Sequence, residues 1–162
     1  SLLVGGSFTN HRIFMRKSLK VQNLQIPRSP RRKRILIIED EAPLLTLLRD
    51  ALQSERLEVL MAKTGREGVA LAFSERPDLI ILDILMPDMD GLAVLRRLRR
   101  DRYKWGKYVP VIILSNISNP EVISEGTKYT EDYLVKADWS LHDLVLKTKE
   151  KLSMNENHRT NH

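Results

Sequence analysis

Four short apolar runs in this sequence end in polar residues. The runs at 35–38, 79–82, 111–114 and 133–135 lead into Glu39-Asp40-Glu41, Asp83, Ser115 and Lys136, respectively. Burying several carboxylates together costs free energy unless a cation compensates their charge. A divalent ion provides that compensation, and a set of oxygen ligands without His or Cys suits Mg²⁺. The pattern predicts a Mg²⁺ site, provided that the four runs end at the same edge of one sheet.

The alternative for these residues is that charges only mark where strands reach the surface. We favour the site because the whole set falls at the same end of successive strands. Other chemistry has weaker support. The four histidines are scattered, there are no cysteines, and the segment Thr64-Gly-Arg-Glu-Gly68 lacks the spacing of a phosphate-binding loop.

Apolar runs and amphipathic stretches alternate along the chain, which predicts an α/β fold. Strands are expected at 35–38, 57–61, 79–82, 111–114 and 133–135, and helices at 43–54, 66–74, 92–101, 120–126 and 141–152. Pro43 suits the first turn of its helix, and Ser140 with Asp143 forms a capping box. Five such units predict a flavodoxin-like, doubly wound (βα)5 parallel sheet of order 2-1-3-4-5. In this fold, ligands bind beyond the carboxyl ends of strands 1 and 3.

The positive charge of the chain is confined to one part of the sequence. The 162 residues carry a formal charge of +6, but residues 1–34 hold nine Lys or Arg and no acidic residue, whereas residues 35–162 hold 18 basic and 21 acidic residues. We expect a basic, disordered extension at 1–33, one domain at 34–153, a polar tail at 154–162 and no effector domain. The extension could be a nucleic-acid arm, a targeting peptide, a tag remnant or part of an over-extended reading frame whose true start is Met15. No apolar run is long enough to span a membrane, and the lack of cysteine favours the cytoplasm.

The polar clusters also carry a family resemblance. The segments ILIIEDE (35–41), LDILMPDMDG (82–91), VIILS (111–115) and YLVK (133–136) resemble the receiver domain of two-component signalling, in the same order and with similar spacing. The resemblance covers residues 34–153, and its most specific segment is 83–91. It implies a stand-alone, CheY-like response regulator that catalyses only its own phosphorylation and slow dephosphorylation, and so is not an enzyme in the usual sense.

The resemblance implies the following site. Asp83 is the phosphoacceptor, and its donor is a sensor histidine kinase, a phosphotransfer protein or a small phosphodonor. Asp40, Asp83 and the backbone carbonyl of Leu85 bind Mg²⁺ directly, while Glu39 acts through water. The ion and Lys136 neutralise charge on the transferring oxygens.

The resemblance also implies a switch. The Ser115 hydroxyl bonds the attached phosphoryl group and draws its loop inward, and Tyr133 then turns from exposed to buried. This changes the face formed by the helix near 120–126, the strand 133–135 and the last helix, through which a target protein binds.

Four positions depart from the family pattern or bear on access to the site. Ala137 stands where the family usually has a cis proline, so we expect a trans Lys136–Ala137 bond or local strain. Asn116 replaces a small residue, and two effects are open: narrower access to the phosphoryl group or an added hydrogen bond. The apolar side chains of Leu85 and Ile117 are expected to flank the approach of water, which predicts slow dephosphorylation.

Three other functions compete with this interpretation. The Arg-rich arm would suit a nucleic-acid-binding regulator, although the acidic balance of the remaining chain argues against it. Asp88-Met-Asp90-Gly91 resembles the Asp-x-Asp-Gly of aspartyl-phosphate phosphatases, but no apolar strand runs directly into Asp88. A receiver that no longer accepts phosphate is the third, and the presence of Asp40, Asp83, Ser115 and Lys136 argues against it.

Overall fold

A five-stranded parallel sheet forms the centre of the domain, in the predicted order β2-β1-β3-β4-β5. The computed structural model describes residues 31–159. The strands are β1 (Arg34–Ile38), β2 (Glu58–Ala62), β3 (Leu79–Leu82), β4 (Val111–Ser115) and β5 (Asp132–Val135). The predicted extension at 1–33 falls almost wholly outside the described residues.

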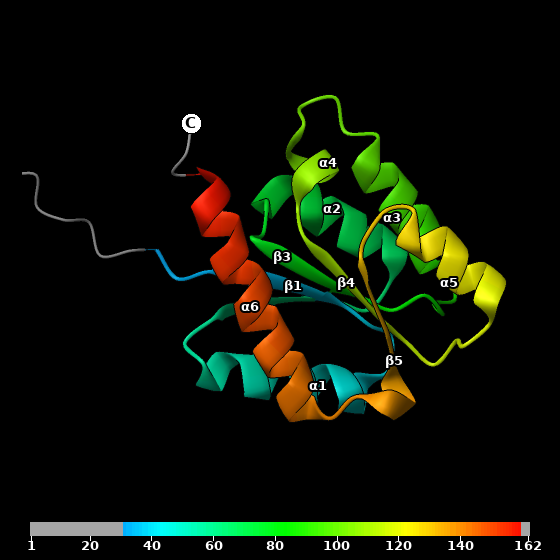
Figure 1. The fold of residues 1–162 in the computed structure, drawn as a ribbon, viewed down its shortest axis with the longest axis horizontal. Coiled ribbons are helices and arrows are strands. Elements are labelled where there is room, and N and C mark those ends of the chain that lie inside the picture. Colours follow the sequence, from blue (N-terminus) through cyan, green and yellow to red (C-terminus); the bar gives the residue numbers. More distant parts are fainter. Residues whose placement is uncertain (1–30, 160–162) are drawn as a thin grey trace, which may run out of the picture. The chain divides into compact units, whose positions relative to one another are not determined.

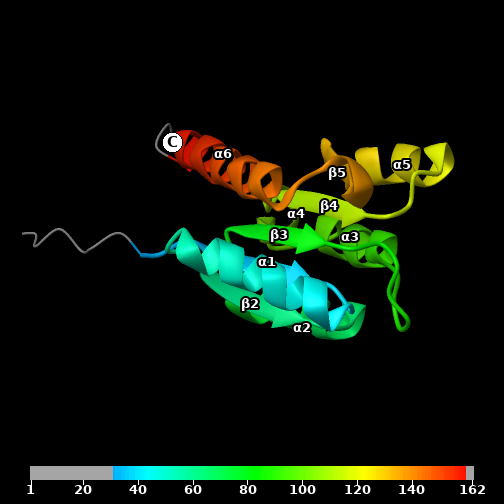
Figure 2. The ribbon, with the colours of Figure 1, turned by 90° about the horizontal axis from the view of Figure 1, so that it is seen from below.

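Helices cover both faces of the sheet (Figures 1 and 2). The helices are α1 (Ala42–Ser54), α2 (Gly65–Glu75), α3 (Gly91–Arg99), α4 (Trp105–Tyr108), α5 (Pro120–Thr127) and α6 (Leu141–Arg159), with a 3₁₀ turn at η1 (Lys136–Asp138). One face carries α1 and α6, and the other carries α2, α3, α4 and α5. No helix within residues 31–159 combines the length and apolar character that crossing a bilayer requires.

Each central strand supplies side chains to both faces. Ile35 and Ile37 of β1 pack in the cluster under α1 and α6, whereas Leu36 and Ile38 pack in the cluster under α2 and α3. Because helices cover both faces, the central strands read as continuous apolar runs, which is why the sequence identified them. Because the side chains within the strands are buried on both faces, the strand ends are the first positions where polar side chains can reach a ligand.

Local sequence signals set the helix starts. Thr64, Asp90 and Asn119 each accept a hydrogen bond from a backbone N–H in the first turn of the helix that follows. The capping box is confirmed, since Ser140 Oγ accepts from the Asp143 N–H while the Asp143 carboxylate accepts from the Ser140 N–H.

Two helices differ from the prediction or were missed. The last helix continues beyond its predicted end at 152 to Arg159, and residues 153–159 contain no Gly or Pro that would end a helix. The short α4 was not predicted, because a four-residue helix containing Gly106 has no periodicity to detect. The Lys136–Ala137 bond is trans, as expected, and Lys136 starts η1.

Removing a core side chain tests the packing. Leu95 on α3 is fully buried, whereas Leu47 on α1 is half exposed. We predict that Leu95→Ala lowers the free energy of unfolding by about 2–5 kcal/mol, from lost burial and a residual cavity. The matched Leu47→Ala should change it by about 0.5 kcal/mol or less. Urea unfolding measures both, and equal effects would contradict the assignment of the core.

Candidate phosphoryl-acceptor site

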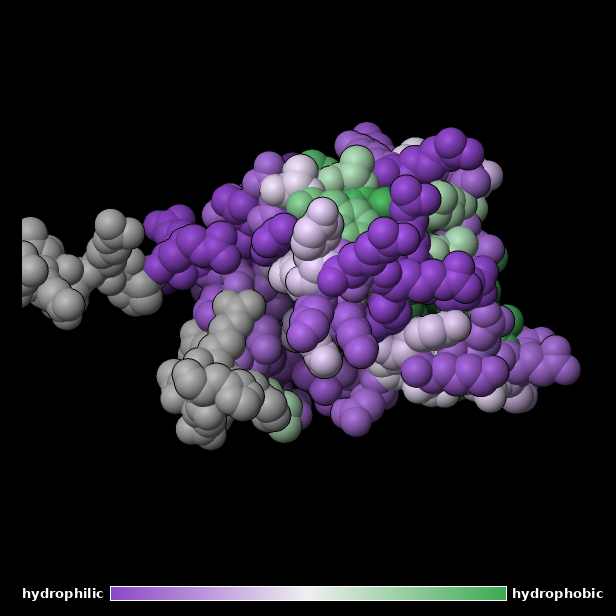
Figure 3. All heavy atoms as spheres, turned by 90° about the horizontal axis from the view of Figure 1, so that it is seen from above, coloured by the Kyte–Doolittle hydropathy of each residue, from purple (hydrophilic) through white to green (hydrophobic). Residues whose placement is uncertain are grey.

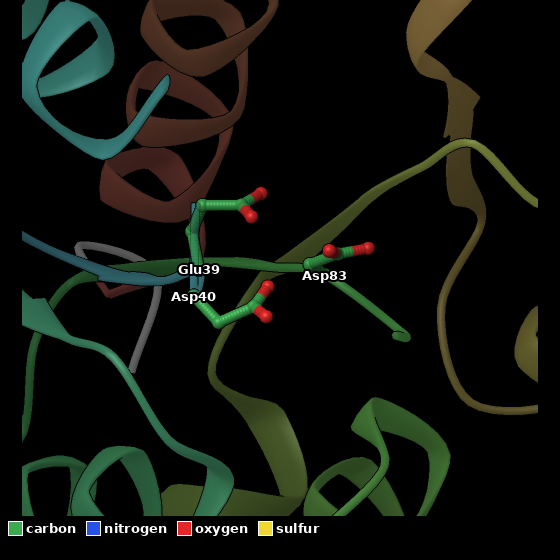
Figure 4. Close-up of side chains that lie close together, drawn as sticks. All are labelled: Glu39, Asp40 and Asp83. Atoms are coloured by element: carbon green, nitrogen blue, oxygen red, sulfur yellow. The ribbon is translucent and has the colours of Figure 1, made fainter. Parts of the chain in front are cut away.

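Three carboxylates meet at the carboxyl edge of the sheet. Glu39 and Asp40 follow β1, Asp83 follows the neighbouring β3, and one oxygen of each lies within 4.8 Å of the others. Figure 4 shows the three side chains extending into one region from these two strand ends. Glu39 and Asp83 are 2% and 4% exposed, whereas Asp40 is exposed. The predicted acidic cluster is therefore present, with an open side at Asp40.

Lys136 joins two of these carboxylates. Its Nζ lies 2.8 Å from Glu39 Oε2 and 3.3 Å from Asp83 Oδ2. Burial raises the pKa of Glu39, although the Lys136 hydrogen bond acts in the opposite direction. Burial alone would lower the pKa of Lys136, but the hydrogen bond to Glu39 and the charge of Asp83 outweigh it and raise that pKa. Lys136 is therefore a fixed cation directed at Asp83.

The loop after Asp83 folds back onto its own start. Asp83 Oδ1 accepts a 2.7 Å hydrogen bond from the Ile84 N–H, and the Gly91 N–H donates to the Ile84 carbonyl at 2.9 Å. A Cβ at position 91 would lie only 2.2 Å from the Asp83 carbonyl oxygen. Glycine is thus required where α3 begins. This close approach of Gly91 to the Asp83 carbonyl fixes the backbone that carries Asp83.

Ser115 and Tyr133 both form hydrogen bonds with the backbone of Ile117. Ser115, fully buried at the end of β4, accepts from the Ile117 N–H at 3.3 Å. The Tyr133 hydroxyl donates to the Ile117 carbonyl at 3.0 Å. Burial raises the pKa of Tyr133. The half-buried Tyr133 ring lies against Gly126 of α5, where a Cβ would come within 2.9 Å of it. A movement of the Ser115 loop therefore acts directly on Tyr133.

The residues expected beside the site differ in exposure. Leu85 is 58% exposed and Asn116 is exposed, while Ile117 is half-buried. Leu85 donates a long 3.4 Å hydrogen bond from its N–H to Asp83 Oδ1, which places its backbone beside the Asp83 carboxylate.

The two aspartates of the phosphatase-like motif have structural roles. Asp88 accepts from the Gly65 N–H at 2.9 Å and the Arg66 N–H at 3.0 Å, so it caps the start of α2. These hydrogen bonds, that of Arg66 first, lower the pKa of Asp88. Asp90 accepts from the Ala93 N–H and caps α3. The contact of Asp88 spans more than 20 residues, so no local signal in the sequence could reveal it.

Comparison with known proteins gives one consistent family. The response regulator receiver domain family matches residues 35–149. The Escherichia coli KDP operon transcriptional regulatory protein KdpE is 40% identical over 103 residues, which cover 63% of this chain and 44% of that protein. The Mycobacterium tuberculosis transcriptional regulatory protein TrcR is 34% identical over 117 residues, covering 72% and 44%. The chain thus spans less than half the length of these curated relatives.

Solved structures match along almost their whole length. A CheY-like receiver domain protein from Methanospirillum hungatei is 30% identical with a TM-score of 0.71, and the match covers 78% of this chain and 98% of that one. The Thermotoga maritima response regulator TrrA, solved in complex with Mg²⁺-BeF, is 32% identical with a TM-score of 0.64, covering 74% and 98%. With the sheet order, the edge cluster and these matches in agreement, this chain belongs to the receiver domain family of two-component response regulators.

Proposed function

We propose that this domain accepts a phosphoryl group on Asp83, with Mg²⁺ bound beside it, in a two-component phosphorelay. The observation that carries the proposal is the buried Asp83 carboxylate, 3.3 Å from Lys136 Nζ and clustered with Glu39 and Asp40. A phosphorylated sensor histidine kinase or phosphotransfer protein is the expected donor. In the transfer, the phosphorus–nitrogen bond of the donor breaks as a bond from phosphorus to an Asp83 oxygen forms, and the nitrogen retains the electron pair.

The arrangement of side chains supports this chemistry. Phosphoryl transfer depends mainly on position and on compensating the charge of the transferred oxygens. Lys136 is held by Glu39 and directed at Asp83, so it does not need to reorganise when charge develops there. The Asp83 backbone is fixed because the chain at Gly91 packs against the Asp83 carbonyl. These residues therefore present one carboxylate, in one orientation, to an incoming donor.

The donor set fits Mg²⁺. All the candidate ligands are hard oxygens, and three carboxylates face one ammonium group, which leaves negative charge uncompensated. Asp40, Asp83 and the Leu85 carbonyl would hold the ion directly and Glu39 would hold it through water. When bound, the ion would supply further positive charge beside the transferring oxygens.

The contacts of Ile117 provide a route for the output. The Ser115 hydroxyl would donate to a phosphoryl oxygen while its oxygen still accepts from the Ile117 N–H, so a reoriented Ser115 would carry the Ile117 backbone with it. The shifted loop then changes the hydrogen bond between the Ile117 carbonyl and Tyr133, and with it the face of α5, β5 and α6. That face is where we place the target protein.

Two arrangements of the whole protein remain to be compared. One is a stand-alone receiver, and the other is a receiver that forms part of a longer regulator. The matched relatives include transcriptional regulators at least twice as long as the match, which favours a receiver that is part of a longer regulator. Immunoblotting of native extracts with an antibody to the domain would distinguish them, since a band much longer than 162 residues would exclude the stand-alone form.

We predict that Asp83 is the sole phosphoacceptor. Incubation with Mg²⁺ and a small phosphodonor should add one phosphoryl mass to the wild type and none to Asp83→Asn, as read by intact-mass spectrometry. Asp88→Asn is the matched control and should still gain the mass, because Asp88 caps α2. A mass gain in Asp83→Asn equal to that of the wild type would contradict the assignment.

Removing Asp40 should separate metal binding from folding. At Mg²⁺ concentrations about tenfold above the dissociation constant, the wild type should be stabilised by about 1.4 kcal/mol. Asp40→Ala should lose this stabilisation and phosphorylation, while its metal-free form stays folded and is no less stable, since one of three crowded carboxylates is gone. Thermal unfolding with and without Mg²⁺ measures the effect. The exposed Asp50→Ala should behave like the wild type, and an unchanged Mg²⁺ response in Asp40→Ala would place the ion elsewhere.

The lifetime of the phosphorylated state should depend on Leu85 and Ile117. Neither side chain can orient a water molecule for in-line attack on phosphorus, so we expect slow self-dephosphorylation. Leu85→Asn or Ile117→Glu should speed the loss of phosphate by about tenfold, which requires a barrier lower by only about 1.4 kcal/mol. Time-resolved intact mass follows the loss, with Leu47→Asn as a control on another exposed leucine. If neither variant loses phosphate faster than the wild type, water access does not set the lifetime.

A further inference from the structure

Residues 96–108, which we call the basic ridge, run from the last turn of α3 through α4. The ridge holds seven Lys or Arg and one acidic residue, Asp101. The other residues of 35–162 hold 11 Lys or Arg and 20 Asp or Glu. The mild negative charge of the domain therefore conceals a strongly basic segment on an otherwise acidic body. Charge separation of this kind is typical of a surface that binds a polyanion.

Five of the seven cations have no acidic partner within the described residues. Arg96 pairs with Glu125 of α5, and the Arg99 guanidinium donates to backbone carbonyls. The remaining five are exposed and make no ion pair with any residue in 31–159; they are Arg97, Arg100, Arg102, Lys104 and Lys107. Their charge is available to a ligand.

The ridge has a defined backbone. Arg99 donates to the carbonyls of Tyr129, Gly106 and Val109 at 2.7–3.0 Å, which ties α4 and the loop after α5 to the end of α3. Asp101 accepts from the N–H groups of Tyr103 and Gly106. The one acidic side chain of the ridge is thus used to shape it. The exposed side chains are presented from a fixed loop.

Aromatic rings lie among the free cations. Tyr103 and Tyr108 are 83% and 69% exposed, and Lys107 Nζ lies 5.6 Å from the centre of the Tyr108 ring. Trp105 packs edge-on against Phe73 of α2, with ring centroids 6.0 Å apart. The large exposed apolar side chains of the ridge are both tyrosines, and none is aliphatic.

A groove continues this surface toward α2. It has a volume of about 360 Å³, is lined by Val69, Ala70, Phe73 and Met89, and has Arg66 and Arg97 beside it. Figure 3, which views the molecule from the α4 side, shows an apolar patch among strongly hydrophilic side chains. Flat apolar surfaces therefore alternate with free guanidinium and ammonium groups.

We propose that the basic ridge and the adjoining groove bind a single-stranded nucleic acid. Unpaired cations neutralise successive phosphates, and exposed rings stack on unpaired bases, which is the combination that single-strand binding uses. An acidic peptide would pair with the cations, but its carboxylates would gain nothing from the exposed rings of Tyr103 and Tyr108. A membrane surface would favour exposed aliphatic side chains, which the ridge lacks.

The ridge and the phosphoryl-acceptor site lie at opposite edges of the sheet. The α3 helix begins at Gly91, beside Asp83, and runs antiparallel to the strands to reach the edge where β4 begins. The two sites share no side chain. The cations and tyrosines of the basic ridge can therefore be changed without touching the phosphoryl-acceptor site, whereas the groove reaches Met89 and Arg66 beside the loop that follows Asp83.

Fluorescence polarisation with a labelled, mixed-sequence 20-mer of single-stranded RNA and the full chain tests the proposal. The triple variant Arg97→Gln/Arg100→Gln/Arg102→Gln should bind at least tenfold more weakly than the wild type in 0.1 M salt. The slope of log affinity against log salt should shrink by about 2, at roughly 0.7 per lost phosphate contact. The matched triple variant Lys63→Gln/Lys128→Gln/Lys149→Gln has the same net charge and should bind nearly as the wild type does. Equal losses of affinity in the two triple variants would show that net charge alone attracts the RNA, and would overturn the assignment of binding to the basic ridge.

The rings are tested separately. Tyr103→Ala/Tyr108→Ala should weaken single-strand binding by about tenfold and leave the salt slope unchanged, because stacking releases no counterions. Unchanged affinity, equal binding of a duplex of the same sequence, or equal binding of polyglutamate would each contradict a single-stranded ligand. Circular dichroism and phosphoryl-mass gain should match the wild type in every variant, which separates loss of binding from loss of folding.

Discussion

Crowding of negative charge at the carboxyl edge of the sheet is the constraint on which this structure depends. Glu39, Asp40 and Asp83 bring three carboxylates together, and two of them are almost fully buried. Within residues 31–159, Lys136 is the cation that forms ion pairs with this cluster. One ammonium group cannot balance three carboxylates, so the cluster keeps an excess of negative charge.

The surrounding elements hold these charges in place. The strands that carry them are fixed by burial on both faces, so their ends have little freedom. The loop after Asp83 is closed by Gly91, and it is fastened to α2 through Asp88 and to α3 through Asp90. Residues around Ile117 have fewer such ties, and they connect Ser115 with Tyr133. The Asp83 side of the site is rigid, whereas Ser115 and Tyr133 are each held to Ile117 by a single hydrogen bond.

The sequence predicted most of the fold and the acidic cluster because both depend on short-range patterns. Continuous apolar runs revealed the strands, and the polar residues that ended them fell at one edge of the sheet. Features that depend on contacts between distant segments were missed. Asp88 caps a helix that begins more than 20 residues earlier, and α4 exists because Arg99 and Asp101 bind its backbone. Net charge was also a poor guide to surface chemistry, because the average over residues 35–162 concealed the basic ridge.

A crystal structure of the full chain grown with Mg²⁺ and beryllium fluoride would test the central claim most directly. Beryllofluoride stands in for the phosphoryl group on the acceptor carboxylate. The account predicts beryllium attached to an Asp83 oxygen, Mg²⁺ bound by Asp40, Asp83 and the Leu85 carbonyl, and Lys136 in contact with fluoride. Beryllium on any other carboxylate, or Mg²⁺ bound without Asp40 and Asp83, would contradict it.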